Sequence, residues 1–213
     1  MTTETADLSA LDFTPGSLAV SPETADLLFR QAHTVNTFAN GEVSDEQIQA
    51  AYDLLRWGPT AMNTQPLRLL LVRAPEARAR LGEHMAEGNR ARVLAAPLTI
   101  VAAADTNFHE HLGTLVPHMP GARDMFAGDA TAREAMARTS ALIQVGYLVV
   151  ALRAVGLHVG PMGGFDAGAI DADLLAGTDW KSLLVLNVGT PSGPDASRPR
   201  APRLEFAQAS ISA

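Results

Sequence analysis

One long segment past the middle of the chain limits the folds open to it more than any other feature. Residues 131–156, TAREAMARTSALIQVGYLVVALRAVG, carry the apolar spacing of a helix, and the second half of the segment is apolar almost all round. A helix of that kind is covered by the rest of the protein on most sides, so we predict a central helix. Gly156 is its expected stop, because glycine readily adopts the left-handed conformation that ends helices.

Three short apolar segments are predicted to be buried strands. They are LRLLLVR (67–73), LTIVAAA (98–104) and SLLVLNVG (182–189). Helical patterns dominate the rest of the chain, and the strands are few and scattered. That distribution favours an α+β fold over a repeating β-α-β pattern.

Two further helices have recognisable starts. In SPETADLLFRQA, Ser21 is a plausible N-cap and Pro22 occupies the first helical position, where a missing N–H costs nothing. The segment SDEQIQAAYDLLRW opens with a capping box formed by Ser44 and Gln47. The apolar residues of this second helix lie on one helical face: Ile48, Ala51, Tyr52 and Leu55.

Length and composition fit one domain with a packed core. The chain has 213 residues, of which 47% are apolar. Residues 1–20 lack periodicity and are predicted to form a loose arm, which leaves residues 21–213 as a single domain ending in an extended, proline-rich tail. The absence of cysteine excludes a disulfide scaffold, a thiolate nucleophile and cysteine-ligated metal or iron–sulfur sites.

Charge and hydropathy limit the partners and the location. The net charge is −7 and no long basic run occurs, which argues against a nucleic-acid partner. The N-terminal MTTETADLSALD is acidic and lacks the apolar core of a signal peptide. No apolar run approaches the roughly 20 residues of a membrane span. We therefore expect a cytoplasmic protein without a membrane or nucleic-acid partner.

The segment FHEHLGTLVPH contains three histidines, His109, His111 and His118. A His-x-His pair on a strand can ligate a metal, with His118 as the third ligand. No run of strands surrounds the pair and the acidic residues show no ligand spacing, so surface or pocket histidines fit the pattern better. We predict no metal site and keep a histidine-based metal enzyme as an alternative.

Several familiar catalytic motifs are absent. The chain has no phosphate-binding G-x-x-x-x-G-K-[ST], no G-x-G-x-x-G after a strand, and no G-x-S-x-G elbow of a hydrolase. The glycine-rich GPMGGFD (160–166) has two readings. It is either a simple turn or a backbone that lets a flat ligand approach closely.

The segment WGPTAMNTQP (57–66) follows the second helix directly. Glycine and proline end helices, so a turn is expected there. Asn63 and Gln65 carry side-chain amides that can read the polar edge of a planar heterocycle, and a cap followed by a polar loop is the simpler alternative. Further polar islands lie at HTVN (33–36), EGNRAR (87–92) and RPRAPR (198–203). Together they offer amides, arginines and hydroxyls without a nucleophile, as in a site that holds a reactive cofactor.

Four segments, in this order, resemble the FMN-dependent nitroreductase family: RWGPTAMNTQPLRLLLVR, EGNRARVLAAPLTIVAA, ALRAVGLHVGPMGGFD and RAPRLEFAQA. The resemblance extends from about residue 21 to residue 208, and within the family it is closest to the malonic semialdehyde reductases associated with pyrimidine breakdown. It implies an α+β fold with a small, mainly antiparallel sheet surrounded by helices. It also implies an intertwined homodimer with FMN sites at the interface.

The resemblance also implies which residues contact FMN. One loop meets the flavin, partly from the neighbouring subunit, through Pro59, Thr60, Ala61, Asn63 and Gln65. Two residues match positions that hydrogen-bond the pyrimidine edge of the isoalloxazine, Asn89 and Arg92. A second loop has a backbone N–H that faces flavin N5, and it comprises Pro161, Met162, Gly163 and Gly164.

The phosphate grip departs from the family pattern. The family's N-terminal Arg-x-Ser-x-Arg is represented only by AHTVN, in which Ala32 and Asn36 stand where basic residues are usual. A phosphate dianion needs charge-assisted partners, so the demand on the arginines of the tail rises. The predicted phosphate contacts are His33, Thr34, Asn36, Arg200 and Arg203.

The activity implied by the resemblance is that of an FMN-dependent NAD(P)H oxidoreductase working by ping-pong hydride transfer. NADPH or NADH reduces the flavin and leaves, and a small electrophilic acceptor then takes the hydride from N5. The branch implies reduction of malonic semialdehyde (3-oxopropanoate) to 3-hydroxypropionate. A general nitro or quinone reductase, and a flavin-binding protein without NAD(P)H turnover, are the alternatives.

The implied homodimer needs an apolar interface. Because the loop around Asn63 reaches across to the other subunit's flavin, a monomer would hold only half of each site. The interface core is expected on the long helix, at Leu142, Val145, Val149 and Leu152.

Overall fold

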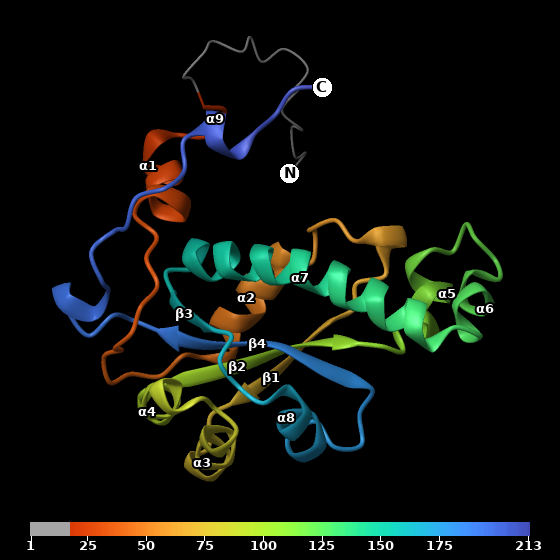
Figure 1. The fold of residues 1–213 in the computed structure, drawn as a ribbon, viewed down its shortest axis with the longest axis horizontal. Helices are drawn as coiled ribbons and strands as arrows, with labels where there is room; N and C mark the ends of the chain where they lie inside the picture. The colour runs from red at the N-terminus through yellow and green to blue at the C-terminus, as the bar shows by residue number, and fades with distance from the viewer. Residues whose placement is uncertain (1–17) are drawn as a thin grey trace, which may run out of the picture.

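The computed structural model describes residues 18–213, so the arm predicted for residues 1–20 lies almost wholly outside the described residues. Figure 1 shows a twisted sheet between two helical layers, with α7 and α2 on one face and α3, α4 and α8 on the other. The α+β fold with an antiparallel sheet is confirmed.

The sheet contains four strands in the order β1-β2-β4-β3, and every neighbouring pair is antiparallel. The strands are β1 (Leu67–Val72), β2 (Leu98–Asp105), β3 (His158–Met162) and β4 (Trp180–Gly189). Every residue of β2 is buried, as its central position requires. The three predicted strands are confirmed as β1, β2 and β4.

Strand β3 was not predicted, because Gly160-Pro161 has the composition of a turn. Proline is tolerated here because β3 lies at an edge of the sheet. Gly160 is required because a Cβ at this position would collide with the carbonyl of Val35. The predicted loop is therefore shorter than expected: β3 ends at Met162, and only Gly163 and Gly164 lie beyond it.

The long central helix is confirmed as α7 (Ala130–Ala154). The carboxylate of Asp129 caps its start by accepting a backbone hydrogen bond at 2.9 Å. At its end Gly156 adopts a φ of 82°. The N–H of Leu157 then donates to the carbonyl of Leu152 at 2.8 Å, which satisfies a carbonyl of the last turn.

By length and hydropathy alone α7 could cross a membrane, contrary to the expectation that no segment reaches that limit. Its inner face, however, packs into the core above the sheet through Ala137, Ala141, Leu148 and Leu152. Core packing accounts for only part of the hydropathy of α7, because 44% of its apolar window is buried. The prediction that this helix is covered on most sides is therefore wrong for the single chain.

Both helices predicted before β1 are present. A short α1 (Pro22–Ala25) capped by Ser21 continues into a π-helical turn, η2 (Asp26–Arg30). The predicted capping box of α2 (Asp45–Leu55) is confirmed. Of the four apolar residues on one face of α2, Ile48, Ala51 and Leu55 are buried, whereas Tyr52 is 39% exposed.

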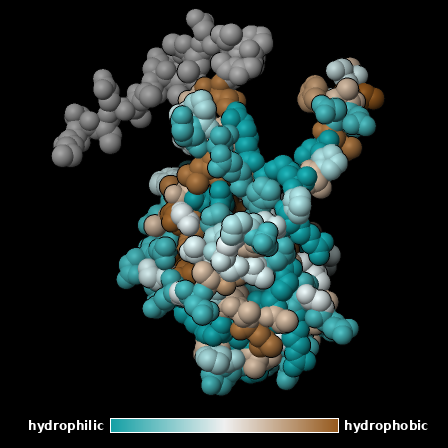
Figure 2. Space-filling view, turned by 90° about the vertical axis from the view of Figure 1, so that its left-hand side faces the viewer, coloured by the Kyte–Doolittle hydropathy of each residue, from teal (hydrophilic) through white to brown (hydrophobic). Residues whose placement is uncertain are grey.

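The remaining elements position loops and the tail. The second helical layer contains α3 (Pro75–Glu83), α4 (Glu87–Ala95) and α8 (Ala167–Asp173). Between β2 and α7 lie η4 (Phe108–His111), α5 (Leu112–Leu115) and α6 (Ala122–Ala127). A single turn, η3 (Ala61–Asn63), precedes β1, and the tail contains η5 (Pro194–Ala196) and α9 (Phe206–Ala209). Figure 2 shows the C-terminal tail projecting from the rounded body.

Candidate functional site

Helix α4 and the loop after β3 meet at a close contact. The side-chain Nδ2 of Asn89 donates to the carbonyl of Gly164 at 3.0 Å, and the backbone N–H of Ala86 donates to the same oxygen at 3.0 Å. A Cβ on Gly164 would lie 2.9 Å from Asn89 Nδ2, so the approach requires glycine. Gly163 differs, because a Cβ there would meet nothing within 4 Å. Two of the predicted site segments are therefore neighbours.

Arg92 lies one turn further along α4 and faces the chain before α2. Its Nη2 lies 3.4 Å from the carbonyl oxygen of Val35, and its Nη1 lies 3.4 Å from Asn89 Oδ1. Its Nε is buried and has no hydrogen-bond partner within residues 18–213. Burial lowers the pKa of the Arg92 guanidinium, and the positive charge of Arg198 lowers it further. A half-buried cation without a carboxylate favours an anionic ligand.

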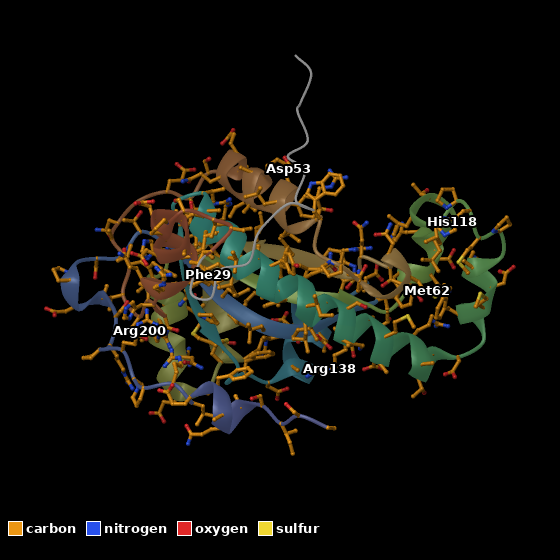
Figure 3. All side chains as sticks on the ribbon, turned by 90° about the horizontal axis from the view of Figure 1, so that it is seen from above. Phe29, Asp53, Met62, His118, Arg138 and Arg200 are labelled. Carbon is orange, nitrogen blue, oxygen red and sulfur yellow. The ribbon has the colours of Figure 1, made fainter. Side chains whose placement is uncertain are left out.

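The proline-rich tail runs beside the segment of residues 33–36. The N–H of Asn36 donates to the carbonyl of Ala196 at 2.8 Å, and Val35 forms an isolated antiparallel bridge with Ser197. This pairing places the arginines of the tail opposite Arg92. Figure 3 shows Arg200 at this end of the molecule.

A hollow of about 510 Å³ opens between these segments, and we call it the basic hollow. Four arginines line it, and no acidic residue among residues 18–213 does. Arg200 donates to the carbonyl of Ala32 at 2.8 Å, and Arg203 donates to that of Ala201 at 2.9 Å. The full lining is Ala32, His33, Thr34, Asn36, Arg92, Arg198, Pro199, Arg200, Ala201 and Arg203. All five predicted phosphate contacts thus lie in one hollow together with Arg92.

Arg198 belongs to this hollow and was not among the residues predicted from the sequence. It lies within the polar island of residues 198–203, which was the only signal for it. Arg92 was expected at the flavin's pyrimidine edge, away from the phosphate. Arg92 lines the same hollow as the tail arginines. The residues predicted at the pyrimidine edge and those predicted at the phosphate are therefore neighbours.

The loop from Pro59 to Gln65 is tied to a different part of the fold. Asn63 Nδ2 donates to the carbonyl of Leu115 in α5 at 2.9 Å, and Gln65 Nε2 donates to Asn63 Oδ1 at 2.8 Å. The N–H of Ala61 donates to Ser140 Oγ on α7 at 3.3 Å. In Figure 3, Met62 and Arg200 lie at opposite ends of the molecule. One chain therefore does not bring this loop to the basic hollow.

The backbone of this loop is strained. Met62, Asn63 and Gln65 have φ of 51°, 52° and 41°, and these are the only non-glycine residues with positive φ in residues 18–213. Such conformations are costly for residues with a Cβ, and they occur preferentially at functional sites. The strain agrees with the functional reading of the two amides in this loop.

The three histidines considered as metal ligands do not form a cluster. His109 and His111 lie in η4, a 3₁₀ helix, and not on the strand that a His-x-His metal site would use. His109 is buried with its Nδ1 unpartnered among the described residues, whereas His111 is exposed. Residues 18–213 contain no group of three or more histidine, cysteine or acidic side chains that could hold a metal ion.

The predicted interface residues divide between the two faces of α7. Val145 and Leu152 are buried in the protein's own core, so the prediction that they form an interface is wrong. Val149 is half-buried against that core, and Leu142 is 42% exposed. The outward apolar face of α7 consists of Leu142, Ile143 and Tyr147.

Comparison with known proteins identifies the family of this chain. The model of the nitroreductase family matches residues 29–190. A Streptomyces griseus protein named "Putative NADH dehydrogenase/NAD(P)H nitroreductase" is 50% identical over 190 residues, covering 89% of this chain and 96% of that protein. A protein of the same name from Leptothrix cholodnii is 48% identical over 179 residues, covering 84% of this chain and 90% of that protein.

Solved structures share the fold at low sequence identity. The nitroreductase family protein from Streptococcus pneumoniae superposes with a TM-score of 0.73 at 20% identity, covering 87% of this chain and 98% of that one. A protein from Exiguobacterium sibiricum, solved in complex with FMN, gives a TM-score of 0.76 at 18% identity, covering 92% of this chain and all of that one. With the family match over residues 29–190, the conclusion is that this chain belongs to the nitroreductase family.

Proposed function

We propose that this nitroreductase is an FMN-dependent NAD(P)H oxidoreductase that reduces a small electrophilic acceptor. The observation that carries the proposal is the convergence of Asn89, Arg92 and Gly164 beside the basic hollow in a chain of this family. When bound, FMN supplies the hydride transfer through N5 of its ring. The protein's own residues bind and orient the cofactor and exclude water.

The residues of the basic hollow fit a phosphate monoester. Arg200 and Arg203 supply charge, and His33 and Thr34 supply further donors from the facing segment. Arg92, whose buried Nε has no partner in the part of the chain that the structure describes, and Asn89 suit the polar edge of the isoalloxazine. The Gly163-Gly164 backbone offers N–H groups without side chains, so a flat ring can approach it.

Two copies of the chain complete each site in this proposal. The strained loop around Asn63 is remote from the basic hollow of its own chain, so it would serve the hollow of a partner. Exposed apolar residues on α7 support a homodimer, because patches of this kind mark interfaces. The projecting tail supports the intertwined form: Leu204, Phe206 and Ile211 are 72%, 84% and 96% exposed.

For the acceptor we propose malonic semialdehyde, supported by the resemblance of the four sequence segments to that branch of the family. Nitro compounds and quinones would then be incidental acceptors. The test is the absorption spectrum of the purified protein followed by steady-state kinetics on an acceptor panel. We expect a flavin spectrum, anaerobic bleaching by NAD(P)H, and a higher kcat/KM for the aldehyde than for a nitroarene. A kcat/KM no better than that of a nitroarene would overturn the acceptor, and a flavin that NAD(P)H fails to bleach would overturn the oxidoreductase.

A further inference from the structure

The basic hollow carries more positive charge than one phosphate neutralises. It has four guanidinium groups, and within residues 18–213 none of them pairs with a carboxylate. A phosphate monoester carries a charge of about −1.5 to −2 at neutral pH. Arg92 is assigned to the edge of the flavin ring, so three guanidinium groups, those of Arg198, Arg200 and Arg203, remain for the phosphate. With the FMN phosphate in place, about one positive charge remains uncompensated. A second anion would balance it.

A second hollow, of about 430 Å³, adjoins the first. The two share His33, Arg198 and Pro199, so Arg198 stands on the ridge between them. Ser197 and Gln31 offer neutral donors to the second hollow, and Asp195 is the one carboxylate among its lining residues.

A buried cation lies behind the wall of the second hollow. His158 lines it, and behind His158 lies the buried guanidinium of Arg153, whose Nη1 is 2.8 Å from His158 Nδ1. Arg153 otherwise donates to the carbonyl of Leu27 and makes no ion pair within the described residues. A buried cation whose partners are neutral acceptors projects its potential into the adjoining space.

We propose that this second hollow binds the 2′-phosphate of the nicotinamide donor, so that NADPH is preferred over NADH. The inference rests on the proposed function and deepens it by naming the donor. Arg198 bonds the 2′-phosphate from the ridge, while Arg200 and Arg203 hold the FMN phosphate on the other side. NADH lacks this dianion and leaves the positive charge of Arg198 unbalanced.

Binding to the FMN-loaded protein tests the proposal without turnover. The probes are adenosine 2′,5′-bisphosphate and adenosine 5′-monophosphate, titrated by calorimetry into the wild type, Arg198→Ala and Arg90→Ala. Arg90 is an exposed arginine of α4 that lies outside both hollows, so Arg90→Ala is a control that removes the same charge. Because hydrogen bonds to charged groups are the strong ones, we expect the bisphosphate to bind at least about tenfold more tightly than the monophosphate. Arg198→Ala should abolish that preference and Arg90→Ala should retain it.

Equal affinity of the wild type for the two nucleotides would overturn the proposal. An equal loss of the preference for the bisphosphate in Arg198→Ala and Arg90→Ala would also overturn it. The kinetic counterpart is the ratio of kcat/KM for NADPH to that for NADH, which should fall about tenfold or more in Arg198→Ala alone. Release of FMN by Arg198→Ala would assign Arg198 to the flavin phosphate and contradict the proposal. Failure of the acceptor panel would refute the proposed reaction and leave the nucleotide titration interpretable.

Discussion

The side-chain amide of Asn89 donates a hydrogen bond to the carbonyl of Gly164, with 3.0 Å between Nδ2 and O. The two residues are 75 positions apart, and the bond joins the start of α4 to the end of β3. A Cβ on residue 164 would lie 2.9 Å from the same amide nitrogen. The hydrogen bond at this distance therefore requires glycine at position 164. The adjacent Gly163 has no such constraint.

Gly164→Ala should therefore displace Asn89 and reduce FMN content in the purified protein. Overpacking of this kind costs about 1–3 kcal/mol, which corresponds to roughly a five- to 150-fold weaker binding if it falls on the cofactor-bound state. Gly163→Ala is the matched control and should keep its FMN. Flavin absorbance per protein chain measures both variants, and equal FMN contents would contradict the assignment.

Arg92→Gln should weaken FMN binding, because Arg92 lies in the same hollow as the tail arginines. Loss of a charge-assisted hydrogen bond costs about 1.5–3 kcal/mol, or roughly a 10- to 150-fold rise in the dissociation constant of FMN. Arg90→Gln changes the same charge on the exposed side of α4 and should have little effect. Fluorescence titration of apoprotein with FMN measures the constants. Equal constants for the two variants would place Arg92 away from the flavin.

His158 should make the protein less stable in mild acid. Burial, with the charge of Arg153, holds the pKa of His158 below its ordinary value near 6.5. As the pH falls, His158 is therefore protonated in the unfolded state before it is protonated in the folded state. The stability that neutral His158 contributes is present above about pH 6.5 and is lost as the pH falls from there towards the folded pKa. Urea unfolding at about pH 7.5 and about pH 5.5 should show a larger loss of stability in the wild type than in His158→Gln. The same pH dependence in both proteins would exclude His158 as the cause.

Ile143→Asp should convert the proposed homodimer to monomers and release FMN. Ile143 is 43% exposed on the outward face of α7, and a carboxylate there would be buried unpaired in the proposed interface. Met125→Asp on α6 is the control, since Met125 is 65% exposed and lies outside that face. Sedimentation velocity with flavin detection at micromolar concentration follows mass and cofactor together. An FMN-loaded monomer would refute the shared site.

Local signals in the sequence predicted much of the fold. The capping box of α2 and the stop of α7 at Gly156 rest on residues within a few positions of each other, and both were found. Strand β3 was missed because its Gly160-Pro161 pair is permitted by an edge position and by contact with Val35, which are tertiary facts.

Long-range relationships were beyond the sequence pattern. A helix apolar all round does not show which face is inward, so Val145 was assigned outside although it is buried. Asn89 and Gly164 are too far apart for spacing to join them, and only the family resemblance named both. Nothing in the sequence distinguishes Arg198 from the other arginines of the tail. The β-bridge between Val35 and Ser197 is what places Arg198 in the hollow.

The most direct test of the central claim, that each FMN site combines the basic hollow of one chain with the Asn63 loop of another, is a subunit-mixing experiment. Arg92→Glu disables the hollow, and Ala61→Arg places a bulky cation on the exposed loop. Each variant alone should lack bound FMN. Equal amounts refolded together form heterodimers in half of the random pairings, and each heterodimer carries one intact site of two, so about a quarter of the wild-type FMN should return. Recovery of no FMN from the mixture would contradict the account and place the whole site within a single chain.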